Sequence, residues 1–176
     1  MKEKTLKSQI LYEGKILNVY KDKVELENGK EDIREYVHND GGVCVLALTE
    51  NQEIIFVKQF RYPFKEVLYE IPGGRKEKEE SFIQTGSREL KEETGYVSQD
   101  VNYFGYLYPT VAYCSEVIHM VLAKNCYYEK QCLDEGEFVE VELIPVSKVK
   151  EMILKNEIKD AKTLVALLKY FSFYEN

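Results

Sequence analysis

Three glutamates stand close together in one short segment of this 176-residue chain. Glu89, Glu92 and Glu93 occupy positions i, i+3 and i+4 within Gly74–Tyr96, GRKEKEESFIQTGSRELKEETGY. On a helix this spacing places the three carboxylates on one face, within about one turn of each other. Like charges at that spacing repel, so a helix that concentrates acid in this way usually has a cation to neutralise it. Oxygen ligands suit Mg²⁺ or Mn²⁺ better than zinc.

The residues around these glutamates carry strong helix signals. Ser81 and Gln84 have the spacing of a capping box, so we expect the helix to begin after Ser81, and Gly95 stands where a C-terminal cap belongs. An adjoining face should pack on a sheet; it comprises Phe82, Ile83, Gly86 and Leu90. Glu93 lies nearest to that face, at the edge of the buried region, where a lower dielectric strengthens the binding of a cation.

The rest of the chain predicts strands interleaved with helices. Residues 9–39 alternate around Asn28-Gly29, a two-residue hairpin signal, and should form a small antiparallel unit. Beyond a change of composition near residue 40, VCVLALTE is nearly all apolar, which is typical of a central strand covered on both faces. We expect further strands at 53–63, 67–74, 101–109, 116–124 and 138–146, and helices at 147–156 and 160–174. This order favours an α/β fold with a mixed sheet between helices.

Composition limits the classes of function. The net charge of −7 disfavours non-specific nucleic-acid binding, and no apolar run is long enough to span a bilayer, so we expect neither partner. The first residues, MKEKTLKSQILYEGK, lack the pattern of a secretory signal. The four cysteines form no CxxC pair, and we favour reduced thiols in a cytoplasmic protein over a zinc or redox site. His119 lies in an apolar strand and should be packed. Because the chain has only two histidines and no nucleophile motif, carboxylates must supply most of the chemistry.

The glutamate segment resembles the Nudix signature, G-x5-E-x7-R-E-U-x-E-E-x-G-U, in which U is a bulky apolar residue. Every fixed position is filled, by Gly74, Glu80, Arg88, Glu89, Leu90, Glu92, Glu93, Gly95 and Tyr96. Nine defined residues at fixed spacing are a highly specific signal. The resemblance extends over nearly the whole chain. Further segments are similar to the ADP-ribose pyrophosphatase branch of Nudix hydrolases, namely VLALTE, VKQFRYP, LYEIPGG, YLYPT, DEGEFVEV and NEIKDAKT.

This resemblance implies an α/β/α Nudix sandwich with a mixed sheet, preceded by a small N-terminal antiparallel β unit. It divides the chain into residues 1–40, a β-strand unit for dimerisation, and residues 41–176, the Nudix hydrolase domain. It implies an enzyme that uses Mg²⁺ (or Mn²⁺) to convert ADP-ribose and water into AMP and ribose 5-phosphate. It also implies a homodimer in which N-terminal strands contribute to the partner's site.

The family pattern implies roles for individual residues. The metal ligands would be Gly73 (through its carbonyl), Glu89, Glu92, Glu93 and Glu137. Arg88 would hold nearby carboxylates in position, and Glu80 is a charge-pairing residue at the helix start. Glu92 and Arg88 therefore count as catalytic, together with a general base from the late acidic loop, DEGEF. We favour Glu135 as that base and Glu137 as a ligand, and the opposite order stays open.

The candidates for substrate binding are Arg61, Glu70, Pro109 and one of several tyrosines, and all but Pro109 have a structural alternative. Arg61 would bind a phosphate with two N–H groups, or it is a surface arginine after a strand. Glu70 would bind a ribose hydroxyl, or it is a charge at a sheet edge. Pro109 precedes the loop that recognises the second sugar in relatives. The ring of a tyrosine would stack on the nucleobase of the substrate, or it serves only in packing. The candidates are Tyr12, Tyr20, Tyr36 and Tyr62.

The chain departs from the branch pattern at two places. Val111–Tyr113 stands where Pro-Gly-Phe is common, which leaves GDP-mannose, ADP-glucose or another nucleoside diphosphate derivative open as the substrate. Thr85-Gly86 stands where two alanines are common, and we expect this difference to adjust packing only. A Nudix-fold sensor that binds a nucleotide without cleaving it is a further alternative, although such modules often lose signature glutamates and this chain has lost none.

Overall fold

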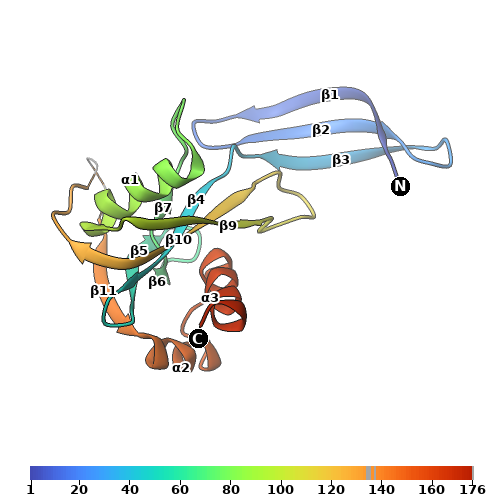
Figure 1. The fold of residues 1–176 in the computed structure, drawn as a ribbon. Helices are drawn as coiled ribbons and strands as arrows, with labels where there is room; N and C mark the ends of the chain where they lie inside the picture. The colour runs from blue at the N-terminus through green and yellow to red at the C-terminus, as the bar shows by residue number, and fades with distance from the viewer. Residues whose placement is uncertain (134–135, 137, 176) are drawn as a thin grey trace. The chain divides into compact units, whose positions relative to one another are not determined.

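The computed structural model describes residues 1–133, 136 and 138–175 of the chain (Figure 1). Contacts within the chain divide it into two compact units. The first comprises Met1–Gly41 and Tyr108–Val117, so it includes the predicted substrate loop. The second comprises Gly42–Leu107 and Ile118–Asn176, and it holds the signature segment. Among the described residues, no helix is both long and apolar enough to cross a membrane.

The first unit contains a three-stranded antiparallel sheet in the order β1-β2-β3, formed by β1 (Lys4–Glu13), β2 (Asn18–Glu25) and β3 (Glu31–His38). The predicted hairpin at Asn28-Gly29 is confirmed, but its two-residue loop is wrong. Leu26 N–H donates to Lys30 O at 2.8 Å, and Gly29 N–H donates to Leu26 O at 2.9 Å, so three residues form the loop. Gly29 has φ +76°, the left-handed conformation that ends a turn of this kind and that glycine adopts freely.

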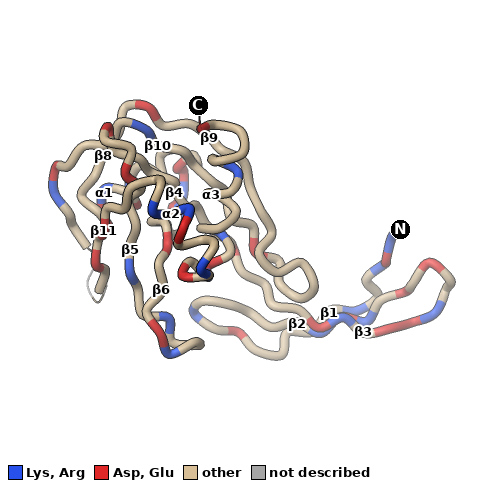
Figure 2. Tube along the Cα trace, turned by 90° about the horizontal axis from the view of Figure 1, so that it is seen from below, with Lys and Arg blue, Asp and Glu red and all other residues tan. Residues whose placement is uncertain are grey.

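Side chains of opposite charge face each other across β2 and β3. Lys23 and Glu31 form an ion pair at 2.5 Å, and Lys21 and Glu35 form one at 3.6 Å. Figure 2 shows acidic and basic residues side by side along these strands. In β1, by contrast, every residue is exposed, including the apolar side chains of Leu6, Ile10, Leu11 and Tyr12. The sheet therefore leaves apolar surface exposed within its own unit.

The second unit is built on a mixed eight-stranded sheet. Its strands are β4 (Gly42–Thr49), β5 (Glu53–Arg61), β6 (Glu66–Glu70), β7 (Gly73–Gly74), β8 (Tyr96–Val97), β9 (Asp100–Leu107), β10 (Ile118–Tyr128) and β11 (Glu140–Pro145). The main order is β11-β5-β4-β10-β8, while β6 pairs with β5, β7 with β4 and β9 with β10. Only β4 and β10 run parallel among the described pairs. The sequence did not predict β8.

Strand β4 lies at the centre of this sheet, as its apolar sequence predicted, and residues 43–49 are buried. Its successive side chains point to opposite faces. Val43, Val45 and Ala47 join Leu90 in one core cluster, and Cys44, Leu46 and Leu48 join a second. The first cluster is covered by α1 (Phe82–Thr94), and the second by α2 (Val146–Leu154) and α3 (Ala161–Phe173), so helices lie on both faces (Figure 1).

The capping signals of α1 are confirmed. The Ser81 hydroxyl accepts from Gln84 N–H, the Gln84 side chain accepts from Ser81 N–H, and Gly95 is a left-handed C-cap with φ +77°. The expectation that Ile83 packs on the sheet is wrong, since its side chain is 39% exposed. At that end of the helix Phe82 makes the contact and stacks on His119 with 3.6 Å between ring centroids. His119 is therefore packed, as predicted.

Candidate active site

Arg88 lies at the centre of the charged residues of α1. Its Nη1 donates to Glu89 Oε1 at 2.9 Å and to Glu92 Oε2 at 2.8 Å. Its Nε and Nη2 both donate to Glu80, and Nη2 also donates to Arg75 O at 3.0 Å. All five N–H donors of the guanidinium therefore have acceptors. These contacts, led by those from Glu80, raise the pKa of Arg88 further above its already high value.

Glu80 is the anchor of this arginine. Oε1 accepts from Arg88 Nε at 2.9 Å, and Oε2 accepts from Arg88 Nη2 at 3.2 Å. The Thr85 hydroxyl and Glu77 N–H donate to the same Oε2, at 2.8 and 3.1 Å. The hydrogen bonds from Arg88 are the main reason that the pKa of Glu80 falls to about 2, so this carboxylate stays ionised at neutral pH.

Glu93 is held by neutral donors at the buried edge of the helix. Its side chain belongs to the buried set, with 4% exposure. Oε1 accepts from Gln59 Nε2 at 2.8 Å, and Oε2 accepts from Gly73 N–H at the same distance. Gln131 Nε2 donates to the Glu93 carbonyl at 2.6 Å. Gly73 and Glu93 were predicted from the sequence as site residues, whereas Gln59 and Gln131 were not.

The two glycines before the helix bring the main chain close to the glutamates. In β7, Gly74 pairs with Val43 and Gly73 pairs with Cys44, which fixes the IPGG segment against the central strand. A Cβ atom on Gly74 would lie 2.3 Å from a carboxylate oxygen of Glu89, and one on Gly73 would lie 2.3 Å from Val43 O. Glycine is therefore required at position 73, where main-chain atoms lie this close, whereas a side chain at position 74 would displace the Glu89 carboxylate.

This donor set fits a hard divalent cation by its chemistry. Glu80, Glu89 and Glu92 all bind the guanidinium of Arg88 through carboxylate oxygens, and such oxygens are the ligands that hard divalent cations prefer. Arg88 Nη1 also shows that a positive charge fits between Glu89 and Glu92. In the conformation described, no three His, Cys, Asp or Glu side chains within the described ranges converge on one metal position. The predicted Glu135 and Glu137 lie outside the described residues.

A second charged cluster, which we call the Glu70 cluster, comprises Arg61, Glu70, Asp160 and Lys162. Arg61 donates to both oxygens of Glu70, with Nε at 2.5 Å from Oε1 and Nη2 at 2.6 Å from Oε2. Lys162 Nζ binds Glu70 Oε2 as well, and it binds Asp160 Oδ2 at 2.9 Å. Asp160 is also the N-cap of α3. The cluster therefore connects β5 and β6 to the start of that helix.

Glu70 is 2% exposed, yet it stays charged. Burial alone would raise its pKa, but the hydrogen bond from Arg61 and the charge of Lys162 outweigh burial and hold the pKa below its usual value. Lys162 is affected in the same way: burial would lower its pKa, and Asp160 and Glu70 raise it instead. Two acids and two bases thus neutralise each other in this cluster.

The remaining predicted substrate residues are on the surface or in the first unit. Tyr62 is 74% exposed, and Lys65 Nζ lies 2.8 Å from its ring centroid. Pro109 is half-buried and precedes a turn in which Cys114 N–H donates to Thr110 O at 3.1 Å. The four cysteines are free thiols. Burial raises the pKa of Cys44 and Cys126 to about 12, which keeps both protonated and unreactive.

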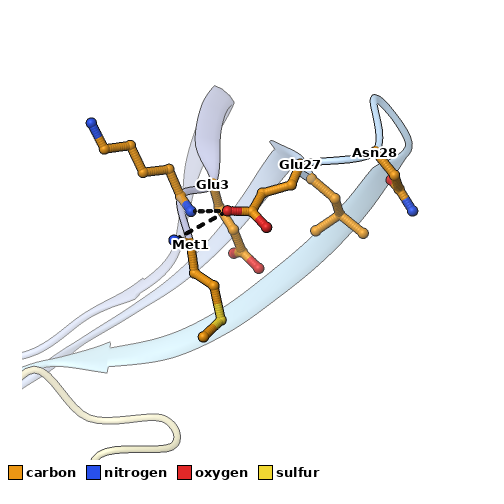
Figure 3. Close-up of a pocket in the computed structure, with 6 residues that line it drawn as sticks. Met1, Glu3, Glu27 and Asn28 are labelled. Atoms are coloured by element: carbon orange, nitrogen blue, oxygen red, sulfur yellow. Dashed lines mark hydrogen bonds and ion pairs between the residues drawn. The ribbon is translucent and has the colours of Figure 1, made fainter.

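Two hollows bear on where a small molecule would bind. One, of about 310 Å³, lies in the second unit and is lined by Gln59, Phe60, Gly136, Phe138 and Val139. It adjoins Gln59, which holds Glu93. The other, of about 580 Å³, lies in the first unit around Met1, Glu3, Glu27 and Asn28 (Figure 3). There Glu27 Oε1 lies 3.2 Å from the N-terminal nitrogen of Met1 and accepts from the backbone N–H of Lys2 at 2.9 Å. None of the predicted site residues that the structure describes lines this hollow.

Comparisons with known proteins show which families the sequence matches. Residues 38–167 match the family model of the NUDIX domain, and residues 3–37 match that of the nucleoside diphosphate sugar hydrolase N-terminal domain. The chain is 39% identical to the ADP-ribose pyrophosphatase of Bacillus subtilis (strain 168), over 95% of this chain and 91% of the relative. It is 34% identical to the methanol dehydrogenase activator of Bacillus methanolicus, over 94% and 90%.

The fold is also similar to a crystal structure described as an ADP compounds hydrolase. The TM-score is 0.88 over 98% of this chain and 94% of that chain, at 19% sequence identity. This likeness confirms the predicted α/β/α sandwich with a mixed sheet and the additional antiparallel sheet. The match of the NUDIX model over residues 38–167 and the 39% identity to the Bacillus subtilis relative show that the chain belongs to the Nudix hydrolase family.

Proposed function

We propose that this protein hydrolyses the diphosphate bond of ADP-ribose or a related nucleoside diphosphate sugar, with Mg²⁺ or Mn²⁺. For ADP-ribose the products would be AMP and ribose 5-phosphate. The observation that carries the proposal is the glutamate face of α1, formed by Glu89, Glu92 and Glu93. Arg88 binds Glu89 and Glu92, and the β7 strand binds Glu93 through Gly73 N–H, so the face has a defined arrangement. The similarity to the ADP-ribose pyrophosphatase of Bacillus subtilis, over nearly the full length of both chains, supports this substrate class.

Glu89, Glu92, Glu93 and the Gly73 carbonyl would hold the cation, and Glu137 would complete its ligands. When bound, the cation would screen the negative charge of the diphosphate and lower the pKa of a bound water. Such stabilisation of charge on phosphate oxygens is typically the largest part of catalysis in phosphoryl transfer. Glu135 would accept the proton of the attacking water, as the family resemblance implies.

The other residues of the site would orient the reactants. Arg88 holds Glu89 and Glu92 with one nitrogen, which fixes two of the proposed ligands relative to each other. Arg61 is held by Glu70 through Nε and Nη2, so Nη1 is the nitrogen that would reach a phosphate oxygen. Glu70 would then act on the substrate through Arg61, since its own oxygens already bind two cations.

The identity of the sugar is the finer part of the proposal. Val111–Tyr113 differs from the branch pattern, which motivates GDP-mannose or ADP-glucose as the rival substrate. The match of residues 3–37 to the nucleoside diphosphate sugar hydrolase N-terminal domain suits any member of this class. A nucleotide sensor that does not hydrolyse its ligand is the rival from another class, and the complete signature argues against it.

We further propose that the protein is a homodimer. The first unit is a three-stranded sheet whose β1 exposes Leu6, Ile10, Leu11 and Tyr12. An apolar surface of this kind is typical of an interface. Light scattering at micromolar concentration should give twice the mass of one chain, and a monomer alone would contradict the proposal.

A substrate panel tests the activity directly. The purified protein is incubated with ADP-ribose, ADP-glucose and GDP-mannose, with Mg²⁺ or with EDTA, and the products are separated and identified. We expect AMP and ribose 5-phosphate from ADP-ribose, no turnover with EDTA, and at least a tenfold preference for ADP-ribose. A smaller preference would favour the rival sugars. Binding of a nucleotide without any product would favour the sensor.

A further inference from the structure

Thr85 is a buried polar residue whose role the sequence did not indicate. It has no exposed surface. Its hydroxyl lies 2.8 Å from Glu80 Oε2 and 3.1 Å from the Ser81 carbonyl oxygen, and both of these atoms are acceptors. A hydroxyl has one proton to donate. The shorter distance and the charge of the carboxylate place that proton on the side of Glu80.

The Thr85 hydroxyl is the shortest contact that Glu80 Oε2 receives. The other two donors to this oxygen, Glu77 N–H and Arg88 Nη2, lie at 3.1 and 3.2 Å. Without the hydroxyl, Oε2 would keep only these longer contacts, and the carboxylate could rotate away from its present position. Thr85 therefore fixes the group on which Arg88 is anchored.

The position of Arg88 matters because its two edges serve different partners. Nε and Nη2 face Glu80, whereas Nη1 binds Glu89 and Glu92. A divalent cation on the glutamate face would need oxygens of these same two carboxylates. An arginine that is less firmly bound to Glu80 would move toward Glu89 and Glu92 and would compete more strongly with the cation.

We propose that Thr85 is a positioning residue for the divalent cation, acting through Glu80 and Arg88. The inference rests on the proposed function only in taking a divalent cation as the ligand of the glutamate face. It replaces the expectation that the Thr85-Gly86 pair adjusts packing only. Alanine, which the family pattern commonly has at this position, cannot make the contact, so the device is a property of this chain.

The test compares Mn²⁺ binding by Thr85 variants without any substrate. Isothermal titration calorimetry gives the dissociation constant for wild type, Thr85→Val and Thr85→Ser. Valine keeps the shape of threonine and lacks the hydroxyl, whereas serine keeps the hydroxyl and loses a methyl group. We expect Mn²⁺ to bind Thr85→Val about three- to tenfold more weakly. This range assumes that only part of the free energy of the lost hydrogen bond to Glu80 reaches the cation through Arg88. Thr85→Ser should stay within about twofold of wild type.

A double variant shows whether the effect passes through Glu80. In a Glu80→Gln background, Thr85→Val should change the Mn²⁺ affinity by less than it does alone, because the two residues act in one chain of contacts. Circular dichroism confirms that each variant is folded. If Thr85→Val does not fold, Thr85→Ala takes its place, since alanine is common here in the family pattern and should be accommodated.

Two results would overturn the inference. One is wild-type affinity in the hydroxyl-free variants, and the other is equal weakening in Thr85→Ser and Thr85→Val, which would assign the effect to packing. Failure of the proposed function is separate: if wild-type protein binds no Mn²⁺, the metal assignment itself is wrong. If wild type binds Mn²⁺ and the panel shows no hydrolysis, the titration still decides the role of Thr85.

Discussion

The glutamate face of α1 and the Glu70 cluster are both made of charged side chains, but their charge balance differs. Beside the face, the carboxylates of Glu80, Glu89 and Glu92 all pair with the guanidinium of Arg88. In the Glu70 cluster, Glu70 and Asp160 are matched by Arg61 and Lys162. The side chain of Glu92 is 34% exposed, whereas that of Glu70 is 3% exposed.

This difference separates an acidic face, which we propose binds a cation, from a cluster whose own charges are balanced. In the Glu70 cluster each carboxylate already has a cationic partner, so these carboxylates do not need a metal ion. A partly exposed face with more acid than base favours the entry of a cation. Loss of one charge should therefore affect activity with little change in stability in the first case, and should lower the stability in the second.

Glu93→Gln should have the largest effect on activity. The substitution removes a proposed ligand charge while keeping the shape of the side chain and an acceptor for Gly73 N–H. Turnover with Mg²⁺ should fall by about 10³-fold, and the free energy of unfolding in urea should change by less than about 1 kcal/mol. Glu92→Gln, at the more exposed ligand, provides the parallel measurement. Near-normal turnover in both variants would reject the metal assignment.

Glu70→Gln should have the largest effect on stability. It would leave Arg61 and Lys162 with a single acid, Asp160, and breaking the buried pair of Glu70 and Lys162 from one side should cost about 3 kcal/mol. Urea unfolding measures this change. Glu66→Gln is the matched control on the same strand, because Glu66 pairs with Lys159 at the surface and should contribute less than about 1 kcal/mol. Equal effects would show that the Glu70 cluster is not special.

Acid should remove the contribution of Glu70 in wild type. The pKa of Glu70 in the folded protein lies below its unfolded value. The unfolded chain therefore binds more protons in acid, and the stabilisation is complete above pH about 4.5 and declines as the pH falls further. The difference in unfolding free energy between wild type and Glu70→Gln should shrink in the same range. A difference that is constant from pH 7 to pH 3 would contradict this pKa.

Gln59→Leu should have the smallest effect of the four. Gln59 donates to Glu93 Oε1, so its loss would leave the carboxylate held by Gly73 N–H but free to change its orientation. We expect turnover to fall by about tenfold or less, with the free energy of unfolding within about 1 kcal/mol of wild type. Steady-state kinetics at saturating Mg²⁺ would check this value, and unchanged turnover would show that Glu93 needs no such support.

The sequence predicted the features that depend on neighbouring residues. The boundaries of α1 follow from Ser81, Gln84 and Gly95, each of which acts within one helical turn, and the structure confirms all three. The central position of β4 follows from its unbroken apolar run. The loop of the β2–β3 hairpin was missed because Gly29 serves in both two-residue and three-residue turns, and only the hydrogen-bond register distinguishes them.

Contacts between distant residues could not be read from the sequence. Lys162 reaches Glu70 across 92 positions, and Gln59 reaches Glu93 across 34. Neither residue type is unusual in its segment, so no local signal marked them. Thr85 was visible as a departure from the family pattern, but its partner Glu80 becomes evident only once the helix start brings the two side chains together.

Locating the cation in a crystal tests most directly whether Glu89, Glu92 and Glu93 bind a divalent metal. Crystals grown with Mn²⁺ and a non-hydrolysable analogue of ADP-ribose would show the metal by anomalous scattering. We expect a peak within about 2.5 Å of carboxylate oxygens from at least two of Glu89, Glu92 and Glu93, next to the diphosphate of the analogue. A bound analogue with no metal peak near residues 89–93 would contradict the account.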